Sequence, residues 1–247
     1  MRVVVAGATG LVGSRTVVRL RDHGVEVVPL PHRDHSDAAA ERDLARALRG
    51  ADIVVDVTDA PSPAEPLSLQ FFRTSTTALL AAAERAGAEH HVVLSFVGAE
   101  RLLSGWFRAK LLLEDQVRRS PVPHSIVRAA LSFECVEAMA RQKAHRDGEV
   151  RVAPALVRPA AADDVAAAVA HVAVGVPLFD TLEVAGPEEF GLDELTAELL
   201  AARGDARQVV ADEHAWFFGA ELQRRSLLPA AHAHGAPTTF REWLARR

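Results

Sequence analysis

The feature that most constrains the fold of this chain is an apolar run followed at once by three glycines. Residues 2–6, Arg-Val-Val-Val-Ala, predict a buried strand, and residues 14–21 have the spacing of an amphipathic helix. Gly7, Gly10 and Gly13 lie between them. Strand, glycine turn and helix in this order form a dinucleotide cradle, in which the helix N-terminus faces the phosphates. The backbone contacts expected from this turn come from Gly7, Thr9, Gly10, Leu11, Val12 and Gly13.

Composition narrows the class of protein. The 247 residues suit one large α/β domain, and a net charge of −5 without a basic block disfavours nucleic acid as a partner. The lone cysteine, Cys135, excludes an internal disulfide and suits the reducing cytoplasm. A strand that begins at the second residue leaves no room for a signal peptide, and no apolar run is long enough to span a membrane. We expect a cytoplasmic monomer or homodimer that acts on a small molecule.

Strand and helix patterns alternate along most of the chain, which predicts a doubly wound parallel sheet of the Rossmann type. The expected strands are 25–30, 53–57, 91–96 and 125–128, and the expected helices are 38–49, 67–86 and 105–119. We assign residues 1–130 to this nucleotide-binding domain and residues 131–247 to a small C-terminal substrate-binding lid in the same compact unit. In the lid we expect a helix over 192–202 capped by Asp193, a helix over 211–228 and a final turn over 240–244.

The residues after the second and third strands bear on the choice of nucleotide. An acidic residue that would hold the ribose of NAD is expected after the second strand, but His32 and Arg33 stand there. The Arg33 guanidinium suits a 2′-phosphate, so NADP is favoured and NAD stays possible; the alternative is a solvated loop arginine. Thr58 follows the third strand and is a further expected cofactor contact. Asp59 beside it could touch ribose or substrate, or could cap a turn.

Several stretches together resemble the atypical short-chain dehydrogenases/reductases, especially their NmrA-like branch. They are the glycine motif at residues 7–13, Ser-Ile-Val-Arg at 125–128, Pro-Ala-Ala-Ala-Asp-Asp-Val-Ala at 159–166 and Glu-Val-Ala-Gly-Pro-Glu at 183–188. The resemblance implies hydride transfer between a nicotinamide and a carbonyl or alcohol. It also implies a serine, a tyrosine and a lysine as catalytic residues. Ser95 matches the serine and Lys110 the lysine, but Trp106 stands at the tyrosine position, and the chain has no tyrosine.

The loss of tyrosine leaves several interpretations open, because an indole N–H donates a hydrogen bond but does not deliver a proton. The protein could be a reductase whose proton comes from Lys110, Ser95 or water, or one whose conjugated, quinone-like acceptor needs no phenol. It could also be a non-catalytic nucleotide sensor that acts through a protein partner, or a non-redox cyclase or isomerase. Trp106 itself could wall the site or simply pack in the core. We favour an NAD(P)H-dependent oxidoreductase acting on a small or medium hydrophobic carbonyl or quinone-like compound.

Other residues carry weaker signals. Glu134 is an acid/base candidate, and Arg128 could bind substrate or form a structural ion pair. Cys135 is expected to pack as a small hydrophobe. His232 and His234 have no further zinc ligands nearby in the sequence, and for Trp216, Phe217 and Phe218 we favour a place in the lid core.

Overall fold

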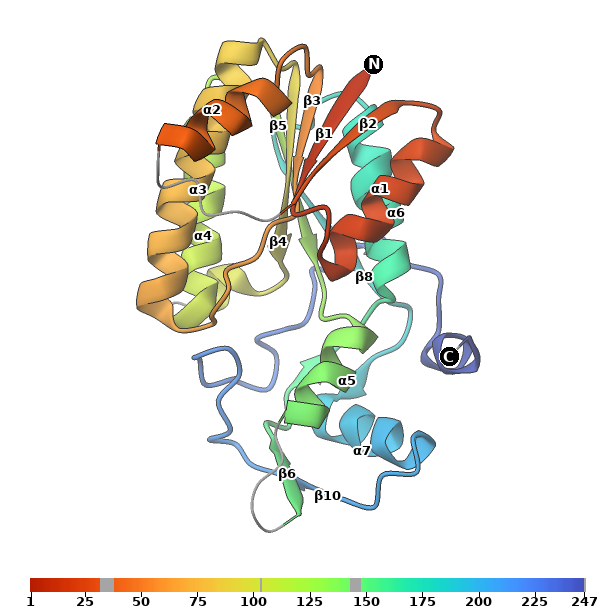
Figure 1. The fold of residues 1–247 in the computed structure, drawn as a ribbon. Helices are drawn as coiled ribbons and strands as arrows, with labels where there is room; N and C mark the ends of the chain where they lie inside the picture. The colour runs from red at the N-terminus through yellow and green to blue at the C-terminus, as the bar shows by residue number, and fades with distance from the viewer. Residues whose placement is uncertain (32–37, 103, 143–147, 247) are drawn as a thin grey trace.

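The computed structural model describes residues 1–31, 38–102, 104–142 and 148–246. A parallel sheet with strand order β11-β8-β5-β4-β3-β1-β2 forms its centre (Figure 1). Its strands are β1 (Arg2–Ala6), β2 (Glu26–Leu30), β3 (Ile53–Asp56), β4 (His90–Phe96), β5 (His124–Ala129), β8 (Thr181–Ala185) and β11 (His234–Gly235). The order reverses at β1 and β3, which is the switch point where open α/β sheets bind ligands.

Helices cover both faces of the sheet (Figure 1). One face carries α2 (Ala38–Ala47), α3 (Glu65–Ala86) and α4 (Gly105–Arg119), and the other carries α1 (Leu11–Asp22) and α6 (Ala162–Val174). β1 shows why the strand sequences are continuous apolar runs. Val4 packs against α2 and α3, whereas Val3 and Val5 pack against α1 and α6. A strand buried on both faces needs apolar residues at every position.

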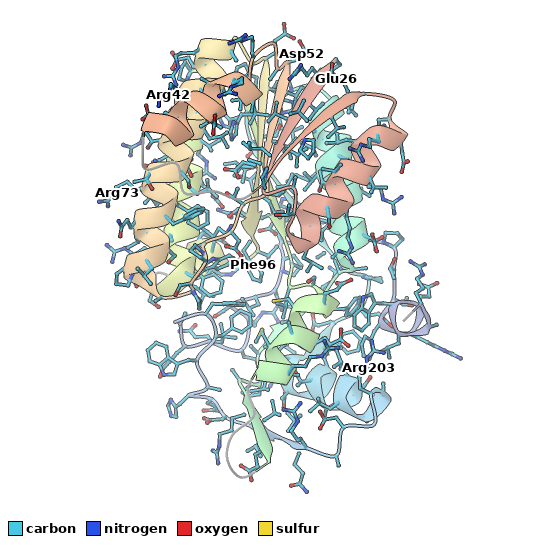
Figure 2. The ribbon with its side chains drawn as sticks, viewed as in Figure 1. Glu26, Arg42, Asp52, Arg73, Phe96 and Arg203 are labelled. Carbon is cyan, nitrogen blue, oxygen red and sulfur yellow. The ribbon has the colours of Figure 1, made fainter. Side chains whose placement is uncertain are left out.

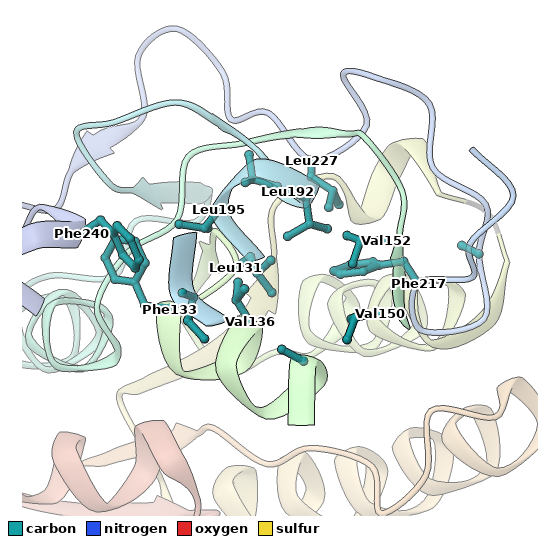
Figure 3. Packing of buried hydrophobic residues seen from close by; sticks show 14 of the residues in the cluster. Leu131, Phe133, Val136, Val150, Val152, Leu192, Leu195, Phe217, Leu227 and Phe240 are labelled. Carbon is teal, nitrogen blue, oxygen red and sulfur yellow. The ribbon is translucent and has the colours of Figure 1, made fainter. Parts of the chain in front are cut away.

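A smaller region lies beyond the carboxyl ends of the central strands (Figures 1 and 2). The remaining elements are the 3₁₀-helix Ala99–Arg101, α5 (Phe133–Gln142), β6 (Glu149–Val152), β7 (Leu156–Val157), β9 (Phe190–Gly191), α7 (Leu192–Ala202), β10 (Gln208–Ala211) and α8 (Phe240–Ala245). β6 pairs with β10, and β7 pairs with β9. Leu131, Phe133, Leu195 and Phe217 belong to one hydrophobic cluster that fills this region (Figure 3).

Two predictions for the C-terminal third are wrong. No helix forms over 211–228, because Phe218 and Gly219 have φ values of 49° and 82°, which no right-handed helix accommodates. Asp193 is not the cap of its helix: the cap is Gly191, whose N–H donates to the Glu194 carboxylate. The helix itself spans Leu192–Ala202 as expected, and it begins directly after the β7–β9 pairing ends at Gly191.

The chain crosses between the two regions more than once. After α5 and β6 it returns to the sheet, where α6 packs on α1 and β8 pairs with β5. The fold class is therefore as predicted, while the division at residue 130 stays a prediction. Within the described part of the chain, no helix combines the length and the apolar character needed to cross a bilayer.

Candidate active site

The glycine turn after β1 has the geometry that the sequence predicts. Gly7 has a φ of 80°, and its N–H donates to the carbonyl of Leu30 at the end of β2. A Cβ on Gly13 would lie 2.0 Å from the Gly7 carbonyl oxygen, so only glycine lets α1 begin this close to the turn. A Cβ on Gly10 would meet only that same oxygen within 4 Å, which leaves the outer side of the turn open. The first N–H groups of α1 thus face an open space without helical partners.

A cavity of about 330 Å³ connects this turn to the predicted catalytic residues. The predicted site residues that line it are Gly7, Thr9, Gly10, Leu11, Val12, Thr58, Ser95, Trp106 and Lys110. Gly13 lies behind the turn rather than in the wall, and Arg33 lies outside the described residues. Further walls come from residues that sequence reasoning did not single out: Val57, Leu94, Phe96, Ala129, Ala130, Ser132 and Val165. Figure 2 shows Phe96 at the junction of the sheet with the smaller region.

Lys110 and Trp106 lie one turn apart on α4, and both contact Asp59. The Trp106 indole Nε1 donates to Asp59 Oδ1 at 2.7 Å, and the Lys110 ammonium lies 3.5 Å from the same oxygen. Lys110 also donates to the Thr58 carbonyl at 3.3 Å, and its Nζ is 4.6 Å and 4.8 Å from the ring centroids of Phe72 and Trp106. Loop contacts and two aromatic faces therefore hold this buried ammonium in place.

Ser95, at the end of β4, is tied to a buried ion network. Its hydroxyl donates to Glu114 Oε1 at 2.6 Å, and Arg128 of β5 donates to both oxygens of the same carboxylate. Burial opposes ionisation of Glu114, yet hydrogen bonds from Arg128 and Ser95 and the nearby charge of Arg118 hold its pKa below the usual value. The single Ser95 proton is thus committed to an ionised carboxylate, and toward the cavity Ser95 can only accept.

A tight turn of the C-terminal segment, at Phe218, forms part of the cavity wall and contacts the start of α4. Phe218 lines the cavity, and its carbonyl oxygen accepts the Trp106 backbone N–H at 3.1 Å. A Cβ on Gly105 would lie 2.4 Å from that oxygen, which explains the glycine before Trp106. Of the three neighbouring aromatic residues, Phe217 is in the core as expected, Phe218 is not, and Trp216 is 63% exposed.

The weaker candidates have structural contacts. Glu134 accepts the Trp243 indole N–H and the Ala162 N–H at the start of α6, which leaves no free acid/base group there. Arg128 forms the structural ion pair described above. Cys135 lines the cavity, but burial, with the charges of Asp59 and Glu134, raises the pKa of its thiol to about 12, so it is a neutral wall group.

Comparison with known proteins agrees with this geometry. Residues 3–97, from β1 to the end of β4, match the model of the NAD dependent epimerase/dehydratase family. No curated protein sequence matches the chain.

Solved structures share the fold over most of the chain or nearly all of it. MoeE5, solved with UDP-glucose and NAD, is 19% identical with a TM-score of 0.77, covering 99% of this chain and 96% of its own. The NADPH-dependent quinone oxidoreductase of Escherichia coli is 18% identical with a TM-score of 0.70, covering 99% and 98%. The triphenylmethane reductase of Citrobacter sp., solved with NADP(H), is 19% identical with a TM-score of 0.62, covering 86% and 79%. At these identities the likeness shows a shared fold alone.

The contacts of Asp59 and Ser95 were not predictable from sequence. Asp59 is 47 residues from Trp106, and Ser95 is 19 residues from Glu114, so no local spacing signals either pair. The one usable signal was position along the chain. Ser95 lies at the end of β4 and Asp59 lies in the loop after β3, on the edge where the carboxyl ends of parallel strands meet.

Proposed function

We propose that the protein is an NAD(P)(H)-dependent oxidoreductase of the atypical short-chain type, acting on a small or medium hydrophobic carbonyl or quinone-like compound. The observation that carries this proposal is the single cavity that runs from the glycine turn to Lys110, Ser95 and Trp106. Structural neighbours solved with NAD, NADPH or NADP(H) support the choice of nucleotide class. Among them are a quinone oxidoreductase and a dye reductase, which supports a reductase of conjugated acceptors.

The residues present fit a bound dinucleotide. The open side of Gly10 and the N-terminus of α1 would receive the pyrophosphate, with Leu11 and Val12 donating through their backbone N–H groups. Thr58 and Lys110 line the cavity beyond the turn, where they would hold the nicotinamide ribose. Arg33 remains our candidate for a 2′-phosphate, so NADP stays the favoured cofactor. The bound nicotinamide would supply or accept a hydride.

The chain's own residues suit an acceptor that needs little proton assistance. Trp106 donates to Asp59, Lys110 to Thr58 and Ser95 to Glu114, so each predicted donor already has an acceptor within the protein. A simple ketone would develop alkoxide character with no proton free on Trp106 or Ser95, and with only the remaining N–H groups of Lys110 as donors. A conjugated, quinone-like acceptor spreads that charge and leaves a weakly basic oxygen. The apolar and aromatic walls formed by Leu94, Phe96 and Phe218 would hold such a ring.

The test is a turnover assay. Purified protein with NADPH and a small quinone should consume NADPH several times faster than it does with a simple aromatic ketone. Consumption should not exceed the uncatalysed rate when Lys110 is replaced by alanine. No NADPH consumption with any quinone, ketone or conjugated acceptor would overturn the oxidoreductase proposal.

A nucleotide sensor that acts through a protein partner is the second candidate. It is supported by the same pairing of donors, because a site that only binds has no need of a free proton donor. The sensor predicts saturable nucleotide binding without turnover, and a Lys110→Ala variant altered in nucleotide affinity alone.

A further inference from the structure

Asp59 is the charged group of the cavity that the proposed function leaves without a role. It lies in the loop after β3, at the switch point of the sheet, and its side chain is 62% exposed. It also lies close enough to Cys135 to raise the pKa of that thiol. Two donors of α4 that line the cavity, Lys110 and Trp106, both point at it.

All contacts of the Asp59 carboxylate fall on one oxygen. Oδ1 accepts the Trp106 Nε1–H at 2.7 Å and the Ala60 N–H at 2.9 Å, and it lies 3.5 Å from the Lys110 ammonium. Among the residues that the structure describes, Oδ2 has no hydrogen-bond partner. The two side-chain donors therefore hold the carboxylate in one orientation and leave a vacant acceptor at the cavity.

The other polar side chains at this end of the cavity cannot accept a proton. An ammonium and an indole N–H only donate, and the thiol of Cys135 stays protonated. Ser95 could pass a proton only to Glu114, whose ionised form Arg128 and Arg118 stabilise. The Thr58 hydroxyl is likewise committed to a carboxylate, that of Asp56. Among the described residues that line the cavity, the carboxylate is that of Asp59, whereas Asp56 and Glu114 lie behind Thr58 and Ser95.

We propose that Asp59 binds the hydroxyl group of an alcohol or hydroquinone through Oδ2 and takes its proton when that substrate is oxidised. This inference rests on the proposed function, which it deepens by naming the substrate group recognised and the residue that exchanges its proton. In the oxidising step the substrate O–H bond breaks and its proton passes to Asp59. The adjacent C–H bond breaks, and its hydrogen leaves with the bonding electron pair as a hydride that passes to NAD(P)⁺. The C=O bond forms from the electron pair of the broken O–H bond. A hydroquinone binds through its hydroxyl group in the same way, as the product of quinone reduction.

The assignment explains why the tyrosine position can hold tryptophan. A phenol serves both directions of the reaction because it can donate and accept. Here Trp106 has no proton to exchange, but it orients the carboxylate that can receive one. Trp106 and Lys110 are then positioning residues for Asp59.

Asp59→Asn is the decisive variant. Its amide oxygen can still accept the Trp106 indole N–H, while an NH₂ group replaces Oδ2, so the vacant acceptor becomes a donor. The matched control is Asp115→Asn on the outer surface of α4, whose carboxylate forms an ion pair with Arg119.

The first readout is binding, measured by calorimetry on the NADP⁺ complex. The probes are 1-phenylethanol and its methyl ether, and hydroquinone and 1,4-dimethoxybenzene. Wild type and Asp115→Asn should bind each hydroxyl compound roughly tenfold more tightly than its ether, and Asp59→Asn should lose this preference, with the Kd for NADP⁺ within about twofold of wild type. The second readout is oxidation of 1-phenylethanol by NADP⁺, where kcat should fall about 100-fold in Asp59→Asn and recover in part in Asp59→Glu.

Three results would overturn the proposal. One is a wild-type protein that does not distinguish hydroxyl compounds from ethers. Another is a preference that persists in Asp59→Asn. The third is an Asp59→Asn variant that loses NADP⁺ affinity and keeps the preference, which would make Asp59 a ribose contact. If wild type binds neither nucleotide, the proposed function itself fails, and nucleotide titration before the probe series separates that outcome from the others.

Discussion

The two ends of the cavity are built in different ways. At the glycine turn the surface is backbone, shaped by the left-handed Gly7 and by the missing Cβ of Gly13. At the other end the surface is side chains, and Trp106, Lys110 and Ser95 are all paired with acceptors of the protein. The first end is preorganised for a ligand, whereas at the second end the donors of Trp106, Lys110 and Ser95 are directed at acceptors of the protein itself. The difference teaches that a retained nucleotide cradle does not by itself imply the usual proton chemistry beside it.

The largest expected effect comes from adding a methyl group at the glycine turn, the backbone end of the cavity. Gly13→Ala places a methyl group 2.0 Å from the Gly7 carbonyl oxygen, so the turn or α1 has to move. We expect a loss of at least about 3 kcal/mol in the free energy of unfolding, together with loss of nucleotide binding. Gly235→Ala is the control, because a Cβ there meets nothing within 4 Å. Urea denaturation and NADPH titration measure both effects, and a Gly13→Ala protein that binds NADPH normally would contradict the described turn.

The next effect is on the buried network at the side-chain end. Glu114→Gln leaves Arg128 without its buried counter-charge and should lower the free energy of unfolding by about 3 kcal/mol at pH 7. The folded protein holds the pKa of Glu114 below its unfolded value, so its contribution is present above that value and disappears as pH falls through the folded pKa. The gap between wild type and variant should therefore narrow below about pH 4.3. A gap that is constant with pH, or as small as that of the exposed control Glu84→Gln, would contradict this account.

A smaller effect is expected from restoring a phenol. Trp106→Tyr gives the cavity a group that can deliver a proton, and we expect roughly tenfold faster reduction of simple aromatic ketones by NADPH. Trp106→Phe, which has no hydroxyl, separates the proton from the change in size. Rates for Trp106→Tyr that are unchanged, or equal to those of Trp106→Phe, would show that proton delivery does not limit the reaction.

The smallest effect on turnover is expected at Ser95. Because its only proton is donated to Glu114, Ser95→Ala should change quinone reduction by no more than about threefold. The same variant should cost about 1 kcal/mol of stability, since a buried hydrogen bond is lost. Steady-state kinetics measures the effect on turnover, and thermal denaturation measures the effect on stability. A 100-fold fall in kcat without a change in stability would return Ser95 to the substrate-orienting role that the family resemblance implies.

The contrast between the two ends also explains what could be predicted from sequence. The glycine turn was predictable because Gly7 and Gly13 are required by close backbone contacts within the same turn and the strands beside it. The parallel sheet was predictable from apolar strands such as Ile53–Asp56. The Trp106–Asp59 pair and the Ser95–Glu114 pair depend on how distant elements pack, which no local pattern records. The helix expected over 211–228 failed for the same reason, because the turn at Phe218 is set by its contact with Gly105 and Trp106.

The most direct test of the central claim is a titration of the purified protein with NADPH and with NADH, followed by nicotinamide fluorescence. The account predicts saturable binding of one nucleotide per chain, with NADPH binding more tightly than NADH, and loss of that binding in Gly13→Ala but not in Gly235→Ala. Absence of saturable binding by either nucleotide at millimolar concentration would contradict it.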